Sequence, residues 1–438
     1  MTNALSRAAQ TPGLLVKVLL TLGVVVIYRL GSFVPAPFVN FQNVQYCLGQ
    51  VEGSSSTGLY DLVNLFSGGA LLQLSVFAMG IMPYITASII VQLLRVVIPR
   101  FDTLYKEGET GQAKLTQYTR YLTIGLGVLQ STTLVTVARA GSLFGSTCSA
   151  PLVANTNWWA IILMILTLTA GTGMIMWLGE IITEKGIGNG MSLLIFCSIA
   201  ASFPSTMSSL WQTSIGTFFL VLGVGIVLMV AIVFIEQSQR RIPVQYAKRM
   251  VGKRVYGGST TYIPLKVNMA GVVPVIFASS LLYVPALIAQ FNQGDGSKKS
   301  PGWVQFITEY LTSSDKPSYM ALFFVLILGF TYFYVAITFN PEEQAENLKK
   351  YGGFIPGVRA GRPTAQYLGY VLNRITLPGS LYLGIVALIP LIALGAVNAN
   401  QNIPFGGTSI LILVGVGLDM IKRINAQLQQ RRYEGLLK

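Results

Sequence analysis

Long apolar runs recur along the chain and are separated by short stretches of polar and charged residues. Ten of these runs approach or exceed the roughly 20 apolar residues that a membrane-spanning helix needs. They cover residues 15–34, 77–97, 119–139, 158–181, 187–203, 216–237, 269–290, 320–340, 375–396 and 407–424. The fifth run, which opens GIGNGMSLL, is the least regular. The pattern predicts ten membrane-spanning helices.

One apolar stretch does not fit this pattern. FSGGALLQLSV, residues 66–76, directly precedes the second predicted span and is too short to cross a bilayer. Its glycine pair, Gly68 and Gly69, makes it a weak isolated helix. Polar backbone at membrane depth is tolerated only inside protein or beside water. We therefore expect a half-helix that folds back into the protein, either as a movable element or as a re-entrant loop with packing duties alone.

Composition agrees with a membrane protein and excludes most enzymes. The 438 residues are 52% hydrophobic and 11% charged, with a mean hydropathy of +0.60, which is typical of a polytopic membrane protein. The chain has no histidine, its three cysteines lack metal-ligand spacing, and it contains no catalytic dyad. The sequence GIGNG, residues 186–190, has no preceding strand or following lysine and is not a nucleotide loop. We expect no catalytic residue, no metal and no cofactor.

The 30 Lys and Arg residues are distributed unevenly over the loops, within a formal charge of +14. With the N-terminus inside, only Arg139, Lys298, Lys299 and Lys316 fall outside, and Arg29 falls within a span. The positive-inside rule then places both termini in the cytoplasm. The polar start MTNALSRAAQTPG lacks a small-residue cleavage site, so we expect the first span to remain in the mature chain.

Two inner loops are larger than this topology requires. Residues 238–267 carry basic side chains and no acidic one, a surface that suits an RNA backbone or an acidic protein face, although positive charge can also follow from topology alone. Residues 341–374 combine a short helical start with a turn-rich tip at 352–363 that presents Arg359 and Arg362. The basic residues of the first loop are Arg240, Arg241, Lys248, Arg249, Lys253, Arg254 and Lys266. Together the loops predict a cytoplasmic docking platform.

The spans carry no ionisable residue near their middle; Glu180, Glu236 and Asp419 lie at inner helix ends. Ion-coupled carriers normally keep such groups at mid-depth. Two classes of function therefore stay open, a partner-driven conduit for polypeptides and a solute transporter with enlarged loops. Co-purification of small membrane subunits and binding of a ribosome or motor ATPase would favour the conduit.

Two cysteines fall in predicted outer loops. Cys47 and Cys148 lie on an oxidising side, where a disulfide could persist. The sequence does not show whether the two loops approach each other, so the pair is a hypothesis.

Several long motifs resemble the SecY family, the large subunit of the bacterial and plastid protein-conducting channel, from about residue 15 to the end. They are RLGSFVPAP (29–37), FSGGALLQLSVFAMGIMPYITASIIVQLL (66–94), WLGEIITEKGIGNGMSLLIF (177–196), PLKVNMAGVVPVIFASSLL (264–282), FIPGVRAGRPT (354–364), GTSILILVGVGLD (407–419) and the closing YEGLLK. The resemblance implies an all-α polytopic membrane protein with ten helices in two inverted five-helix halves, residues 1–203 and 204–438, around a central pore.

In this family the half-helix is a plug in the outer funnel. Here the plug would span about residues 61–75, and its members would include Phe66, Ser67, Gly68, Gly69, Leu71 and Leu72. The resemblance also implies an apolar ring that seals the pore. Its members would be Ile81, Ile85, Met191, Ile195, Ile276 and Ile412, with Met191 at a position where isoleucine is common in relatives.

A side exit for apolar segments would lie between the second and seventh spans, with the third and eighth nearby. Polar residues on or beside these helices are Gln92, Thr133, Asn268, Ser279 and Ser280, although ordinary packing would account for each of them equally well.

The resemblance implies SecE and SecG as companion subunits and the SecA motor ATPase or the ribosome as the energy source, because nothing in the chain binds ATP. Signal peptides, nascent chains and the lipid bilayer would be its other partners. The expected location is the bacterial plasma membrane or the thylakoid membrane, with both termini cytoplasmic or stromal. Arg359 would be needed for productive docking.

Overall fold

The fold is taken from a computed structural model of the whole chain. It describes residues 12–51, 67–139, 151–154, 157–213, 215–246, 249–251, 254–256, 260–291, 302–312, 316–396 and 407–436.

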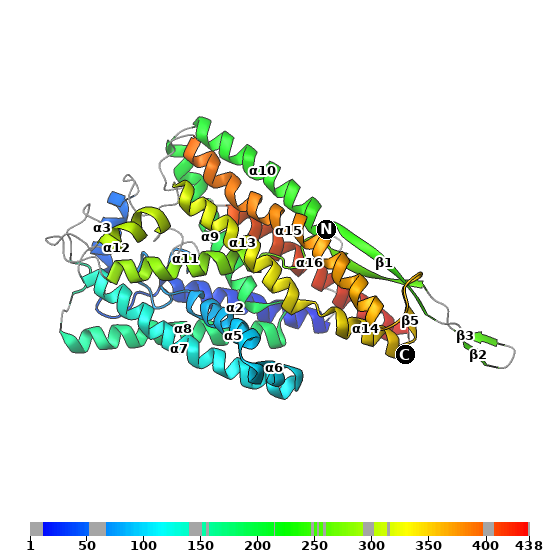
Figure 1. Cartoon of the computed structure of the whole chain (residues 1–438). Helices are drawn as coiled ribbons and strands as arrows, with labels where there is room; N and C mark the ends of the chain where they lie inside the picture. The colour runs from blue at the N-terminus through cyan, green and yellow to red at the C-terminus, as the bar shows by residue number, and fades with distance from the viewer. Residues whose placement is uncertain are drawn as a thin grey trace.

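Helices dominate the described residues and lie side by side in one bundle (Figure 1). They are α2 (Pro12–Phe33), α3 (Phe41–Val51), α5 (Met82–Val97), α6 (Pro99–Lys106), α7 (Glu109–Arg139), α8 (Trp158–Lys185), α9 (Gly190–Thr213), α10 (Ile215–Gln237), α11 (Val273–Phe291), α12 (Gly302–Phe306), α13 (Pro317–Thr338), α14 (Pro341–Lys350), α15 (Arg362–Ala396) and α16 (Gly407–Leu436). A π-helical turn, Ile307–Thr312, follows α12.

Each of the ten predicted spans overlaps one of these helices, namely α2, α5, α7, α8, α9, α10, α11, α13, α15 and α16. Within the described ranges, six helices are long and apolar enough to cross a membrane, or seven if the bent pair α5 and α6 is one span. Shorter apolar helices are Gly190–Pro204 and Val273–Leu282. The chain has the architecture of an all-α polytopic membrane protein.

Several helices extend beyond the apolar run that predicted them. Helix α7 begins at Glu109, α15 begins at Arg362, and α16 continues to Leu436. Hydropathy marks the part of a helix that suits lipid, whereas the helix itself ends where its backbone hydrogen bonds end. The helices therefore continue beyond the predicted spans at these polar ends.

The chain turns sharply between α5 and α6, which meet at 102°. Pro99 opens α6 after an extended Ile98, and a proline at this position is compatible with a helix start. Arg95 lies 3.2 Å from the centre of the Tyr105 ring. The Lys106 ammonium donates to the Asp102 carboxylate at 2.7 Å and thereby lowers the pKa of this exposed acid.

A small sheet projects from one end of the bundle, called the sheet end from here on, and the sequence analysis did not predict it (Figure 1). Strand β1 (Gln239–Tyr246) pairs antiparallel with β4 (Thr260–Lys266) and with β5 (Gly353–Phe354). A hairpin of β2 (Arg249–Val251) and β3 (Arg254–Tyr256) lies beyond them. In β1, Ile242 and Val244 are buried and alternate with exposed residues, which is the pattern of a sheet with one covered face.

The two enlarged loops meet in this sheet, because β1 and β4 come from residues 238–267 and β5 comes from residues 341–374. Ile242 and Val244 of β1 pack with Ile355 and with Leu368 of α15. The predicted helical start of the second loop is confirmed as α14. Its N-terminus is capped by Asn340, whose side chain accepts from the Glu342 amide at 3.1 Å.

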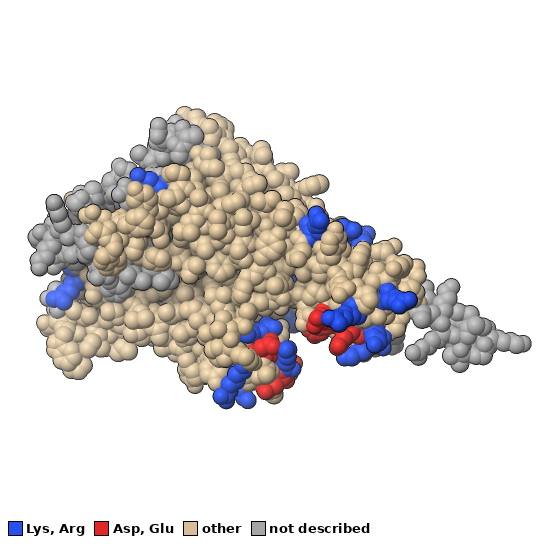
Figure 2. All heavy atoms as spheres, in the orientation of Figure 1, with Lys and Arg blue, Asp and Glu red and all other residues tan. Residues whose placement is uncertain are grey.

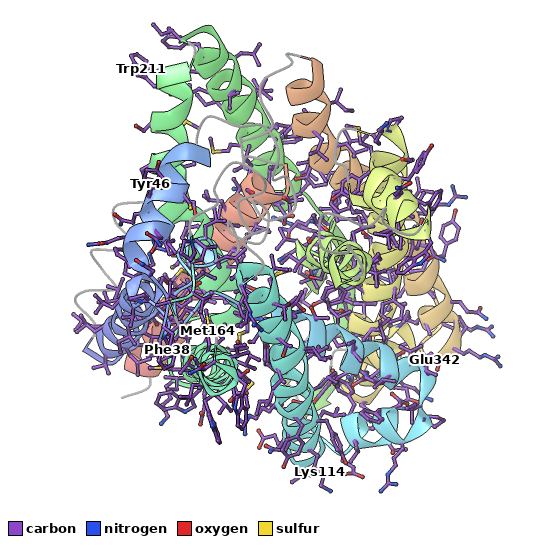
Figure 3. All side chains as sticks on the ribbon, turned by 90° about the vertical axis from the view of Figure 1, so that its left-hand side faces the viewer. Phe38, Tyr46, Lys114, Met164, Trp211 and Glu342 are labelled. Atoms are coloured by element: carbon purple, nitrogen blue, oxygen red, sulfur yellow. The ribbon has the colours of Figure 1, made fainter. Side chains whose placement is uncertain are left out.

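Charged side chains lie toward the ends of the bundle. On the face drawn in Figure 2, Lys, Arg, Asp and Glu gather at the sheet end and around α6, while the broad middle is free of them. Figure 3 views the bundle from the opposite end, where Tyr46 of α3 and Trp211 of α9 lie. A charge-free middle with polar ends is the surface that a bilayer requires.

Candidate functional site

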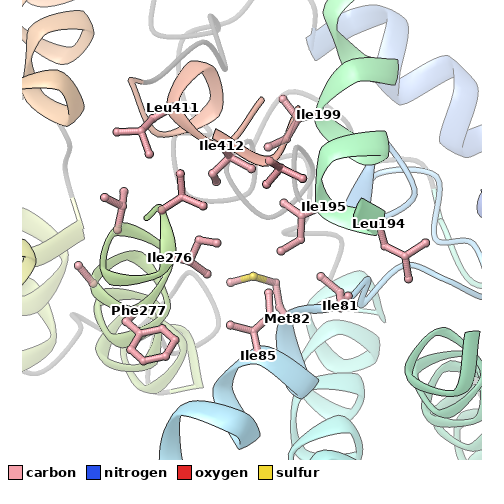
Figure 4. Close-up of a cluster of buried hydrophobic side chains, with 14 of the residues drawn as sticks. Ile81, Met82, Ile85, Leu194, Ile195, Ile199, Ile276, Phe277, Leu411 and Ile412 are labelled. Carbon is pink, nitrogen blue, oxygen red and sulfur yellow. The ribbon is translucent and has the colours of Figure 1, made fainter. Parts of the chain in front are cut away.

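Isoleucines from four helices converge inside the bundle (Figure 4). Ile81 and Ile85 lie at the start of α5, Ile195 on α9, Ile276 on α11 and Ile412 on α16. Each is at most 7% exposed, and all five belong to one apolar cluster. The structure therefore brings together five of the six residues predicted for the ring.

The start of α5 aligns two of these isoleucines. Ile81 is the N-cap, Pro83 lies in the first turn, and the Ile85 amide donates to the Ile81 carbonyl at 3.1 Å. Residues four apart lie on the same face of a helix, so Ile81 and Ile85 point the same way. The same spacing adds Ile199, fully buried one turn after Ile195, which the sequence analysis missed.

The sixth predicted residue, Met191, is partly buried at the edge of the cluster. It packs against α8, since a β-carbon built on Gly179 would lie 2.5 Å from the Met191 sulfur. Met82 is buried within the cluster and appears beside Ile85 in Figure 4. Nothing in its sequence spacing distinguished Met82 from its neighbours.

A polar hollow of about 270 Å³ adjoins the isoleucine cluster on its sheet side. Its lining includes Leu193 of α9, Val416 of α16 and Val272 in the turn before α11, together with Glu236 and Lys422. The Asn268 side chain donates to the Glu236 carboxylate and to the Gly271 carbonyl, which ties the end of α10 to the turn before α11. A hollow lined by charged and apolar side chains thus lies next to the packed isoleucine cluster.

The chain before α5 is a series of turns rather than a helix. Residues 68–81 are turns apart from a bridge at Ser75, and Gly68, Gly69 and Gly80 have positive φ. The prediction that the second span begins at Phe77 was wrong, because α5 begins at Met82. Gly80 at φ +56° adopts a left-handed conformation that breaks the helix before Pro83.

Residues 70–79, called the stem from here on, are anchored in the bundle. Ala70 and Leu74 are fully buried, and Leu74 packs in a cluster with α7 and α8 residues such as Leu134 and Leu168. The Ala36 amide donates to the Leu74 carbonyl at 3.0 Å. Helix α8 approaches so closely that a β-carbon on Gly171 would lie 2.0 Å from the Val76 oxygen.

The predicted plug residues divide between the stem and its base. Ser67, Gly68 and Gly69 form the base, in which the buried Ser67 hydroxyl oxygen accepts from the Leu71 amide at 3.1 Å. Leu71 is buried in the stem, and Leu72 is partly buried. Phe66 and residues 61–65 lie outside the described residues.

The predicted gate helices, α5 and α11, contact each other. Among their described side chains, no hydrogen bond or ion pair joins the two helices. The Gln92 amide donates to Ser88 of its own helix, and Ser279 donates to the Ile276 carbonyl. Ser280 is 1% exposed and its hydroxyl has no partner. Among the side chains that the structure describes, apolar contact closes this seam.

The other two predicted gate residues also bond away from this seam. Thr133 on α7 is buried and donates to the Leu129 carbonyl of its own helix at 2.9 Å. Asn268 is 3% exposed and binds the Glu236 carboxylate beside the polar hollow. Neither residue ties α5 to α11.

The predicted docking arginines lie at the sheet end. Arg240 and Arg241 are exposed on β1, and Arg359 and Arg362 are exposed at the tip of the second loop. The tight turn predicted there is confirmed, since Gly357 and Gly361 have φ of +85° and +101°. Arg249 and Arg254 lie on β2 and β3, where the structure describes the backbone. Lys248 and Lys253 lie outside the described residues.

The structure gives the bonding state of two of the three cysteines. Cys47 on α3 is disulfide-bonded and Cys197 on α9 is a free thiol. Cys148 lies outside the described residues, so its pairing with Cys47 stays a prediction.

Comparisons with known proteins identify the family of this chain. The family model described as SecY matches residues 75–421. The protein translocase subunit SecY of Streptomyces scabiei is 58% identical over the full length of both chains, and that of Mycobacterium bovis is 54% identical, also over the full length of both. The chain belongs to the SecY family. As a member it is the channel subunit of a protein translocase and not an enzyme.

Solved structures show the same fold. A structure described as that of a protein conducting channel has a TM-score of 0.60 at 17% identity, and the match covers 94% of this chain and 91% of the other. A second, whose description says that the plug domain of SecY stabilises the closed channel and maintains a membrane seal, has a TM-score of 0.62 at 17% identity with the same coverage. At this identity the likeness establishes the fold alone.

Proposed function

We propose that the chain passes unfolded secretory polypeptides through the isoleucine constriction and releases apolar segments sideways into lipid between α5 and α11. The observation that carries this proposal is the convergence of Ile81, Ile85, Ile195, Ile276 and Ile412 beside a polar hollow. Apolar side chains that pinch a lumen exclude water and ions without binding a passing chain. A charged ring would seal less well and would retain charged segments of the cargo.

The two halves of the channel are proposed to be residues 1–203 and 204–438, inverted relative to each other and opening as a clamshell. The seam between α5 and α11 suits such an opening. Its described side chains make no hydrogen bond across it, so opening breaks no polar contact between them.

Residues 61–75 are proposed to be the plug. Gly68 and Gly69 would allow its base to move while the stem stays packed.

The energy is proposed to come from partners, which would be the SecA motor or a translating ribosome, with SecE and SecG as companion subunits. The exposed arginines of β1 and of the loop tip support this proposal, because guanidinium groups bind carboxylate and phosphate in bidentate fashion. One structural neighbour, with a TM-score of 0.57 and 18% identity, comes from a canine ribosome-channel complex.

We propose that the chain lies in the bacterial plasma membrane or the thylakoid membrane, with the sheet end and both termini on the cytoplasmic or stromal side.

Site-specific photocrosslinking tests the conduit. The chain is reconstituted with SecE and a stalled nascent secretory protein, and a photoreactive residue replaces Ile81, Ile85, Ile195, Ile276 or Ile412 in turn. We expect crosslinks from all five to the nascent chain. Val227 on α10 is the control, since it is 69% exposed on the bundle surface and should crosslink to lipid. Lipid adducts alone at the five isoleucines would disprove the constriction as the path.

A further inference from the structure

Arg29 is an unusual residue for its position. It lies on α2 near the C-terminal end of a helix that is otherwise apolar, apart from Lys17 near its start. A cation within a membrane-spanning segment costs several kcal/mol unless it finds a partner or reaches the interface. Its contacts therefore indicate what the residue does.

The guanidinium contacts the base of the proposed plug. Arg29 Nη1 donates to the Gly68 carbonyl oxygen at 3.1 Å, across 39 residues of sequence. The guanidinium carbon also lies 5.7 Å from the centre of the Phe33 ring, one turn further along α2. Among the described residues, no carboxylate lies within ion-pair distance of Arg29. The Gly68 carbonyl is thus its described polar partner.

Gly68 is shaped for this contact. It has φ +67°, and a β-carbon there would lie 2.6 Å from Arg29 Nη1 and 3.2 Å from the Ser198 α-carbon of α9. The base is therefore held between α2 and α9 at a residue that has to be glycine. Gly69, at φ +90°, would meet nothing within 4 Å. Gly68 is thus confined by its neighbours, whereas the backbone at Gly69 has space to rotate. The chain can therefore bend at Gly69 while the contact at Gly68 holds it in place.

The neighbouring residue fixes where Arg29 can reach. Tyr28 is 1% exposed, its hydroxyl shares a 2.6 Å hydrogen bond with Ser198, and its ring stacks on Phe77 with centres 6.0 Å apart. Gly31 permits this close packing, since a β-carbon there would lie 2.1 Å from the Phe77 ring. Helix α2 is thus clamped to α9 and to the stem, and Arg29 is held over the Gly68 carbonyl.

We propose that Arg29 is the positioning residue that latches the base of the plug in its closed position, and that this latch sets how strong a signal sequence must be to open the channel. The proposal rests on the proposed role of residues 61–75 as a plug. A hydrogen bond from a charged donor is about twice as strong as a neutral one. Its acceptor is a backbone carbonyl at the hinge, so no plug side chain is needed to form it.

The test uses the Arg29→Leu and Arg29→Lys variants of the full chain, reconstituted with SecE. We expect Arg29→Leu to raise the open fraction of the resting channel about tenfold, equivalent to ~1.4 kcal/mol, seen as ion conductance in planar bilayers. The same variant should export a reporter with a defective signal sequence. Arg29→Lys keeps a donor and the charge, so its effect should be smaller. Abundance and SecE binding should be unchanged.

A deletion of residues 61–69 distinguishes an effect of Arg29 on the plug from an effect on the fold, because it removes the base of the plug and leaves the stem. Arg29→Leu should add nothing to the conductance of this deletion. A further increase in conductance when the two changes are combined would show that Arg29 acts on the bundle, and it would overturn the latch. Wild-type conductance and signal-sequence selectivity in Arg29→Leu would overturn it as well. If the deletion itself leaves conductance unchanged, the plug assignment fails, independently of Arg29.

Discussion

The seam between α7 and α8 and the seam between α5 and α11 are built in opposite ways. Across the first, Arg120 makes a forked pair with Glu180, with Nε to Oε1 at 2.9 Å and Nη2 to Oε2 at 2.7 Å. Across the second, the described side chains make no polar contact, and Ser280 on α11 is buried without a partner. A bidentate pair fixes both distance and angle, whereas apolar contact can separate and re-form. The α5–α11 seam, which we propose to open, thus differs in its chemistry from the α7–α8 seam; they are called the openable and the permanent seam from here on.

Breaking the permanent seam should have the largest effect on stability. In Glu180→Leu, the free energy of unfolding should fall by about 2 kcal/mol, because Arg120 loses a charged partner. The value is below that of a fully buried pair, since the two side chains are 42% and 19% exposed. Thermal unfolding in detergent measures it.

A matched control comes from the exposed pair of Arg423 and Asp419, whose side chains are 52% and 48% exposed. Arg423→Leu should cost less than about 0.5 kcal/mol. The double variant Arg120→Leu with Glu180→Leu should recover part of the loss. Equal losses in Glu180→Leu and Arg423→Leu would show that the forked pair does not hold the seam.

The next largest effect on stability is expected where α8 packs against the stem. Gly171→Ala should destabilise the protein by about 1 to 2 kcal/mol, because the new methyl group meets the Val76 carbonyl and the backbone has to shift. Gly173→Ala is the control on the same helix, since nothing lies within 4 Å of its β-carbon. There alanine should be neutral or stabilising by up to about 1 kcal/mol. Thermal unfolding in detergent measures both variants. Similar changes in the free energy of unfolding for Gly171→Ala and Gly173→Ala would contradict the close approach of α8 to the stem.

Ser280 on α11, one of the predicted gate residues, allows a test that removes a single oxygen atom. Ser280→Ala removes a buried hydroxyl without a partner, so it should stabilise the closed state by about 1 kcal/mol. The channel should then require a stronger signal sequence, measured as the insertion efficiency of a graded series of signals. Ser279→Ala should change this threshold less, because the Ser279 hydroxyl already bonds the Ile276 carbonyl of its own helix. A lower threshold in Ser280→Ala would argue against an apolar closure.

The smallest effect on stability is expected far from both seams, at the loop tip. Arg359→Glu should change the free energy of unfolding by less than about 0.5 kcal/mol, since its side chain is exposed. It should nevertheless block motor-driven secretion in a quantitative export assay, and Arg359→Lys should do so to a lesser extent. Normal export or a lowered abundance of Arg359→Glu, with Arg362→Glu behaving the same way, would contradict the docking role.

The site could be predicted only in part from sequence. Helical spacing puts Ile81 and Ile85 on one face, but their assignment to the ring, like that of Ile276 and Ile412, came from family resemblance. The sheet was missed because β1 contains Arg240, Arg241 and Pro243 and its buried positions alternate only briefly. The strand exists because residues 260–266 and Gly353–Phe354 lie on either side of it, and no local pattern shows such long-range pairing.

The sequence by itself determined where the membrane-spanning helices lie, because a bilayer demands long apolar segments with satisfied backbones and this demand is local. It also determined that residues 66–76 could not span. The tertiary structure alone decided that the stem is held in turns against α8, that α5 begins at Met82, and that Arg29 reaches Gly68. These features depend on contacts between segments far apart in the chain. Whether a partly buried cation such as Arg29 has a partner is decided by the residues that the fold brings beside it.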